Sequence, residues 1–117
     1  MADEDLVDES DAALLSGNGA YGMWNIKLMK SGGITPSQRI AQLADRSGID
    51  VMWGCNDESR IAIAAAMHTA FSASATKYLD LDGAFDIGHD IVNGGFVVDN
   101  GKMRLQDAPG LGVSLID

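Results

Sequence analysis

The sequence predicts an α/β fold built around a parallel sheet. Strand-like segments start about 26 residues apart, at 23–29, 49–55 and 76–83, and helical patterns at 35–48 and 58–72 lie between them. Strands that alternate with helices in this way are typical of βα units. The chain has 117 residues, the size of one ordinary domain. A full (β/α)8 barrel typically needs about 250 residues, so an open doubly wound sheet and part of a barrel are both compatible.

The composition of the chain argues against some classes of binding partner. The chain has 8 basic and 17 acidic residues, a net charge of −9, which argues against nucleic acid or an anionic membrane as partner. The longest apolar run, 61–67, is too short to span a bilayer. Cys55 is the single cysteine, so no internal disulfide can form. Cysteine usage of this kind suits a reducing compartment, and we expect a cytoplasmic location.

The first helix and the first strand follow from local patterns. Residues 8–16 carry acids in their first turn, where the helix dipole favours them, and Gly17 ends the helix. In 23–29, period-two alternation puts three apolar residues on one face and Lys27 on the other. A buried ammonium is costly unless another group uses or neutralises it. The strand therefore raises the question of what Lys27 does.

The helix predicted at 35–48 has the clearest end signals. Thr35 is a good N-cap, Pro36 suits the first helical position, and Gln38 completes a capping box. Gly48 ends the helix.

The later elements alternate in the same way. Residues 49–55 form the second strand, and the alanine-rich segment 58–72 is apolar on nearly every side, which predicts a mostly buried helix. Residues 76–83 form the third strand. An Asn-Gly turn within 96–105 predicts a β-hairpin. The tail at 107–113 is rich in turn residues and is expected to be irregular.

Several side chains lie where active sites of α/β proteins form, at the carboxyl ends of strands. Asp80 and Asp82 share one face of the third strand near its end, and Asp3 lies where a preceding strand would finish. An exposed acidic strand end and a lysine that extends to water are the alternatives for the acidic pair and for Lys27. Lys30, beyond the strand end, is expected to be a solvated loop residue.

Six segments together resemble a known family. They match the C-terminal half of the enolase superfamily in order and spacing, including the acid 24 positions before Lys27: "MADED", "NIKLMKSGG", "MWGCNDES", "AAAMHTA", "YLDLDG" and "PGLGV". Within the superfamily they are most similar to the muconate-lactonizing subgroup, and specifically to dipeptide epimerases of the alanine–glutamate type. The resemblance covers essentially the whole chain. It implies a partial (β/α)8 barrel, the last three to four βα units, with a C-terminal hairpin and tail.

The resemblance also implies a role for each matching residue. Asp3 matches a carboxylate ligand of Mg²⁺, and Lys27 matches one of two lysines that flank the α-carbon of the substrate. Asp80 and Asp82 match the pair that holds the ammonium of the dipeptide's N-terminal residue. Glu58 matches a substrate-side acid whose role is less settled. The family commonly has methionine where this chain has Asn56, so the pocket is expected to differ there.

The implied function is a Mg²⁺-dependent dipeptide epimerase that inverts the α-carbon of the second residue by proton transfer between two lysines. Residues 1–117 would be the C-terminal part of the barrel, without the capping domain and first half, and inactive alone. The alternatives are a cycloisomerase or N-acylamino acid racemase of the same subgroup, or a non-catalytic, self-associating α/β half barrel. The expected partners are a dipeptide and either a second copy or the missing half of the barrel.

Overall fold

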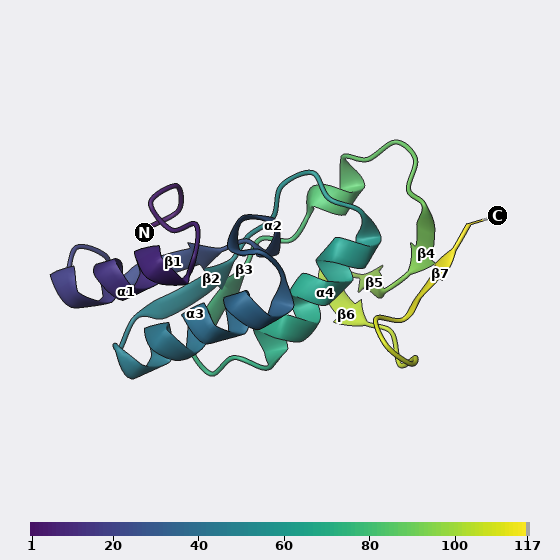
Figure 1. The fold of residues 1–117 in the computed structure, drawn as a ribbon. Coiled ribbons are helices and arrows are strands. Elements are labelled where there is room, and N and C mark those ends of the chain that lie inside the picture. The colour runs from purple at the N-terminus through teal and green to yellow at the C-terminus, as the bar shows by residue number, and fades with distance from the viewer. Residues whose placement is uncertain (117) are drawn as a thin grey trace.

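The computed structural model describes residues 1–116, and their N-terminal part is a parallel sheet covered by helices (Figure 1). The strands are β1 (Met23–Ile26), β2 (Asp50–Trp53) and β3 (Thr76–Leu79), paired in parallel in the order β1-β2-β3. This confirms the predicted α/β fold and its repeated βα units. Each strand is shorter than predicted, because each stops where the chain turns toward the next helix or loop.

A further extended segment pairs with β1. Ala2 forms a parallel bridge with Trp24, through the hydrogen bonds Ala2 N–H to Met23 O at 2.9 Å and Asn25 N–H to Ala2 O at 2.8 Å. This segment ends next to Asp3, where the sequence analysis placed the end of a strand that precedes β1. Its pairing puts Asp3 at the same edge of the sheet as the end of β1.

Three helices cover one face of the sheet: α1 (Glu9–Asn18), α3 (Ile34–Arg46) and α4 (Arg60–Phe71) (Figure 1). The core lies between them and the strands. In β2, Val51 and Trp53 are fully buried, whereas Asp50 and Met52 are partly exposed. This alternation shows that one face of β2 packs against the helices and the other is more open.

Two local predictions were wrong near the end of β1. The strand predicted at 23–29 ends at Ile26, and a single helical turn, α2 (Leu28–Ser31), follows it. The helix predicted to have Thr35 as its N-cap and Pro36 as its first residue starts at Ile34, and its N-cap is Gly33 with φ 107°. A φ of this size favours glycine, so the chain enters the helix two residues earlier than predicted and no capping box forms.

The C-terminal part contains two antiparallel pairs of strands. The predicted hairpin is confirmed as β5 (Phe96–Asp99) and β6 (Lys102–Leu105). Asn100 and Gly101 both have positive φ, 49° and 74°, as a type I′ turn requires.

The other pair joins β4 (Val92–Gly94) to β7 (Val113–Leu115). The tail expected to be irregular at 107–113 consists of bends and turns over 107–112, and the expectation was wrong only at Val113, the first residue of β7. The three residues of β7 gain their strand conformation by pairing with a segment about twenty residues earlier, a contact that no local pattern announces.

Arg60, the first residue of α4, joins the two parts of the molecule. Its Nε donates to the carbonyl of Gly94 at 2.8 Å, its guanidinium also donates to the carbonyl of Phe96, and its backbone N–H donates to Asp90 at 2.7 Å. The guanidinium carbon lies 4.0 Å from the centre of the Phe96 ring, a cation–π contact. One side chain therefore fixes the C-terminal strands against α4.

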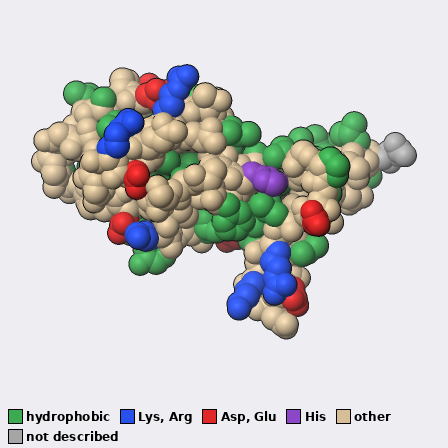
Figure 2. Space-filling model, turned by 90° about the horizontal axis from the view of Figure 1, so that it is seen from below, with side chains coloured by type: hydrophobic (Ala, Val, Ile, Leu, Met, Phe, Trp, Pro, Cys, Tyr) green, Lys and Arg blue, Asp and Glu red, His purple; other side chains and the backbone are tan. Residues whose placement is uncertain are grey.

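Figure 2 shows one face of the molecule, turned from the view of Figure 1. Hydrophobic side chains gather between the two parts, and charged side chains are scattered over the rest of this face. Within residues 1–116 no helix combines the length and apolarity that crossing a membrane requires.

Replacing Arg60 with methionine should loosen the C-terminal strands. The variant loses two hydrogen bonds from a charged donor, so we expect the free energy of unfolding to fall by about 2–3 kcal/mol. Hydrogen exchange of residues 92–105 in the variant should speed up more than exchange of β1 and β2. Arg60→Lys, which keeps the charge without the planar fork, should lie in between. Unchanged exchange in residues 92–105 of the methionine variant would contradict this role.

Candidate active site

The candidate site lies at the carboxyl edge of the parallel sheet. The register sets Ile26 beside Trp53 and Trp53 beside Leu79. Lys27 and Asp80 follow directly at that edge, and Asp80 N–H donates to Trp53 O at 2.8 Å. With neighbouring strands about 4.8 Å apart, the backbones of Lys27 and Asp80 are about 10 Å apart. Side chains from two strands can therefore reach one small substrate.

Asp3 is the centre of a cluster of charges at the β1 side of this edge. The Lys27 ammonium lies 3.4 Å from Oδ2 of Asp3, and the Lys27 side chain is only 14% exposed. Lys30 donates to Oδ1 of Asp3 at 3.0 Å and to its backbone carbonyl at 2.6 Å. Asn25 Nδ2 donates to Oδ2 at 3.0 Å. Both lysines and the buried amide therefore converge on one carboxylate.

The cluster holds Asp3 in its charged form. Burial raises the pKa of Asp3, but the hydrogen bonds from Lys30 and Asn25 and the charges of Lys30 and Lys27 outweigh it, so the pKa lies below its usual value. An ionised carboxylate at this position can bind a cation. Lys30 was expected to be a solvated loop residue, and the structure corrects this, because its side chain is only 15% exposed.

The short helix α2 explains why two lysines reach the same carboxylate. Lys27 is the N-cap of α2 and Lys30 lies in its single turn, so the two residues are three apart on one side of the backbone. Gly32 ends the turn with φ 87°, and its N–H donates to the carbonyl of Leu28. Ser31 Oγ donates to the carbonyl of Lys27 at 3.0 Å, which fixes the backbone of the lysine.

A second group of acids lies at the β2 and β3 side of the edge. Asp80 and Asp82 are exposed, whereas Glu58 is 6% exposed and accepts a hydrogen bond from Asn56 N–H at 3.0 Å. Within residues 1–116 none of the three acids forms an ion pair. Asp80 and Asp82, which are exposed, are therefore free to bind a positively charged group.

Cys55 lies among these acids. Its thiol donates to the carbonyl of Asp80 at 3.4 Å and accepts from Gly83 N–H at 3.3 Å. Burial raises the pKa of Cys55; the Gly83 hydrogen bond opposes this, and the charges of Asp82, Glu58 and Asp80 raise it further. The thiol therefore stays protonated and does not suit a nucleophile. It packs the loop after β2 against the loop after β3.

Sequence patterns did not identify Asn25, Lys30 or Cys55 as part of this edge. Asn25 offered one signal, a polar residue within an otherwise apolar strand and two positions before Lys27. Lys30 offered none, because its partner lies 27 positions earlier.

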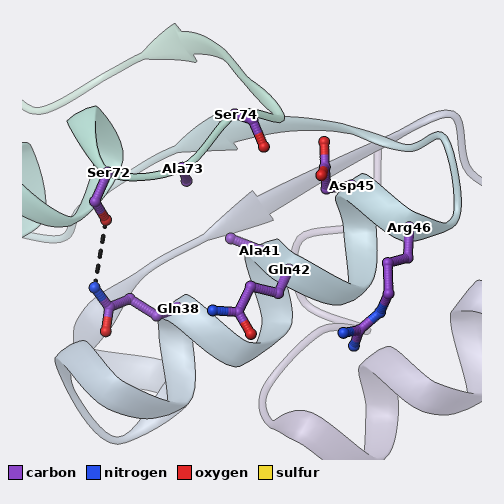
Figure 3. Close-up of a pocket in the computed structure, with 8 residues that line it drawn as sticks. All are labelled: Gln38, Ala41, Gln42, Asp45, Arg46, Ser72, Ala73 and Ser74. Carbon is purple, nitrogen blue, oxygen red and sulfur yellow. Dashed lines mark hydrogen bonds between the residues drawn. The ribbon is translucent and has the colours of Figure 1, made fainter.

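A separate hollow of about 310 Å³ lies at the opposite edge of the sheet, between α3 and the loop that precedes β3 (Figure 3). Gln38 Nε2 donates to Ser72 Oγ across it at 3.3 Å. Because active sites of parallel α/β folds form at the carboxyl ends of the strands, this hollow is not the candidate site.

Residues 1–117 match the family model described as "Enolase C-terminal domain-like" along their whole length. The chain belongs to this family. The match explains the parallel βα units as a portion of the family's barrel domain.

The relatives include several dipeptide epimerases. The chain is 56% identical over 116 residues to the L-Lys-D/L-Arg epimerase of Desulforapulum autotrophicum, covering 98% of this chain and 33% of that protein. It is 39% identical over 117 residues to the L-Ala-D/L-Glu epimerase of Clostridium acetobutylicum, covering 100% of this chain and 33% of that protein. The chain thus spans about a third of the length of these curated relatives.

Solved structures agree with the fold. The dipeptide epimerase of Methylococcus capsulatus complexed with Mg ion has a TM-score of 0.93 at 52% identity, over 98% of this chain and 34% of that one. The same enzyme complexed with Mg and the dipeptide L-Arg-D-Lys has a TM-score of 0.88 at 52% identity, over 92% and 31% of the two chains.

The oxygen atoms of Asp3 and Asn25 fit one side of a magnesium site. Mg²⁺ prefers oxygen ligands and takes one or two carboxylates together with water and substrate. Asp3 supplies a carboxylate, and Oδ1 of the buried Asn25 beside it has no hydrogen-bond partner within residues 1–116. No group of three His, Cys, Asp or Glu side chains in the described part of the chain could hold a metal ion. The remaining ligands would have to come from elsewhere.

Gly83 should be intolerant of any side chain, because it lies where two loops of the site meet. A Cβ at Gly83 would lie 1.9 Å from the backbone oxygen of Asn56, so Gly83→Ala should lower the free energy of unfolding by about 1–3 kcal/mol through overpacking. Gly88→Ala is the matched control, since a Cβ there meets nothing within 4 Å. Urea unfolding of both variants in the natural protein measures the difference, and equal stabilities would refute the close approach of the loops.

Proposed function

We propose that this chain is the C-terminal part of the barrel of a Mg²⁺-dependent dipeptide epimerase, with Lys27 as one of its two bases. The observation that carries the proposal is the position of Lys27, a mostly buried ammonium 3.4 Å from Asp3 and at the same sheet edge as Asp80. Asp3 is the partner that a buried charge of this kind needs, and it holds the Lys27 ammonium at the carboxyl edge of the sheet. Family membership and the dipeptide epimerases among the relatives support the same function.

Two residues of this chain have separate roles in the proposed reaction: Lys27 transfers a proton and Asp3 holds the metal. In its neutral form, the amine of Lys27 accepts the α-proton of the second residue of the dipeptide and becomes an ammonium. A second lysine on the opposite face of the substrate then gives a proton to the α-carbon and becomes neutral, so the configuration inverts and no proton is lost. Asp3 would hold Mg²⁺, which when bound supplies positive charge to the substrate carboxylate.

Asp80 and Asp82 give the substrate its orientation. Their carboxylates lie at the end of β3, unpaired with any cation of the described residues, and would accept hydrogen bonds from the ammonium of the N-terminal residue. Glu58 is the buried acid of the same edge and would add negative charge near the substrate.

The substrate class that we favour is a cationic dipeptide. The relative with 56% identity is an L-Lys-D/L-Arg epimerase, whereas the L-Ala-D/L-Glu epimerase reaches 39%. The acids of the β2 and β3 side match the positive charge of such a dipeptide. This chain contributes one base and one ligand, so we propose that it has no epimerase activity alone. A cytoplasmic location and assembly with a second copy or with the rest of a barrel stay predictions.

Removing the Lys27 amine should stop epimerisation. We expect Lys27→Ala, in the natural protein with Mg²⁺, to lower turnover of Lys-Arg by about 10²–10⁴-fold, because proton transfer by a positioned base contributes that much. The measurement is replacement of the α-proton by deuterium in D₂O together with the change in optical rotation. Lys77→Ala is the control, since Lys77 is an exposed lysine paired with Asp50 at the amino end of the strands. Full activity of Lys27→Ala would rule out the assigned role.

Asp80→Asn tests the substrate class. Loss of a hydrogen bond to a charged group costs about 1.5–3 kcal/mol, so kcat/KM for a dipeptide should fall about tenfold to a hundredfold. Asp50→Asn, at the opposite edge of the sheet, should leave kcat/KM unchanged. Undiminished turnover by Asp80→Asn would reject ammonium binding at this position. Turnover of N-acylated amino acids but not of dipeptides would favour the racemase alternative.

A further inference from the structure

Lys30 lies closer to Asp3 than Lys27 does and makes more contacts with it. Its ammonium lies 2.6 Å from the backbone oxygen and 3.0 Å from Oδ1 of Asp3, whereas the Lys27 ammonium lies 3.4 Å from Oδ2. The third contact of Lys30 is Glu4, with Oε2 at 3.5 Å. A lysine has three donors, and here they are directed to the segment around Asp3. Lys30 is therefore engaged locally and is not available to a substrate.

The two oxygens of Asp3 are held separately. Lys30 donates to Oδ1, and Asn25 Nδ2 donates to Oδ2 at 3.0 Å. Because Lys30 also binds the backbone carbonyl of Asp3, it fixes the side chain relative to the main chain. The carboxylate thus has little freedom to rotate about its side-chain bonds.

We propose that Lys30 is a positioning residue, which fixes the Asp3 carboxylate in the orientation that binds the metal. The inference rests on the proposed function, in which Asp3 is a ligand of Mg²⁺. Partners that orient a metal ligand commonly contribute 10–100-fold to metal affinity. A purely stabilising ion pair at a partly exposed site would instead contribute little to stability and nothing to metal binding.

The experiment measures metal affinity without activity. Mn²⁺ is the probe, titrated into the natural protein that contains this chain, and free Mn²⁺ is followed by electron paramagnetic resonance. Lys30→Met should raise the Kd of Mn²⁺ by about 10–100-fold. Lys30→Arg, which keeps a cation able to bind both oxygens, should recover most of the affinity. Lys77→Met, which removes a lysine from an exposed ion pair, should leave the Kd unchanged.

The arms of the experiment separate the two proposals. If Lys30→Met is folded by circular dichroism and binds Mn²⁺ as tightly as the unaltered protein, or more tightly, the positioning role is overturned. If Lys30→Met does not fold, Lys30→Gln replaces it, with the same expected loss and the same contrary result. Asp3→Asn tests the proposed function itself, because unchanged Mn²⁺ binding in this variant would show that Asp3 is not a ligand. If Asp3→Asn binds Mn²⁺ weakly and Lys30→Met binds it normally, only the role of Lys30 is refuted.

Discussion

Parallel backbone pairing is the constraint on which the rest of this structure depends. The segment at Ala2 and the strands β1, β2 and β3 all run in the same direction, so their carboxyl ends meet at one edge of the sheet. Asp3, Lys27 and Asp80 each follow one of these ends. Their proximity is a consequence of main-chain hydrogen bonds and register, not of attraction between the side chains. The helices cover one face of the sheet and bury the apolar core there, so the polar residues lie at the carboxyl edge of the strands.

The edge that results has two electrostatic halves. On the β1 side, two ammonium groups surround Asp3, so each charge that burial would penalise has an opposite charge within 3.4 Å. On the β2 and β3 side, Glu58, Asp80 and Asp82 have no cation as partner within residues 1–116. A dipeptide carries a carboxylate at one end and an ammonium at the other. The proposed substrate would find complementary charge for its ammonium on the β2 and β3 side, and for its carboxylate in the Mg²⁺ that Asp3 would hold on the β1 side.

Sequence patterns located the main elements of the fold but not every contact at the site. Period-two alternation and helical spacing placed β1, β2, β3 and the helices between them, because both signals depend on which side chains are buried. They failed for Lys30, which resembles any other lysine after a strand until Asp3 is brought beside it. They also failed at Thr35, where a good capping sequence lost to the conformation of the preceding glycine, and at β7, which depends on a distant strand.

The sequence by itself determined the class of fold and the order of its units, because local conformation and burial leave periodic traces in one dimension. Position at strand ends made Asp3, Lys27, Asp80 and Asp82 candidates for a site, and the family resemblance added Glu58. Only the tertiary structure decided that Lys30 and Asn25 hold the two oxygens of Asp3, and that the thiol of Cys55 packs between the acids. Contacts of this kind join residues 22 to 27 positions apart, and their geometry depends on the register of the sheet and on a single helical turn.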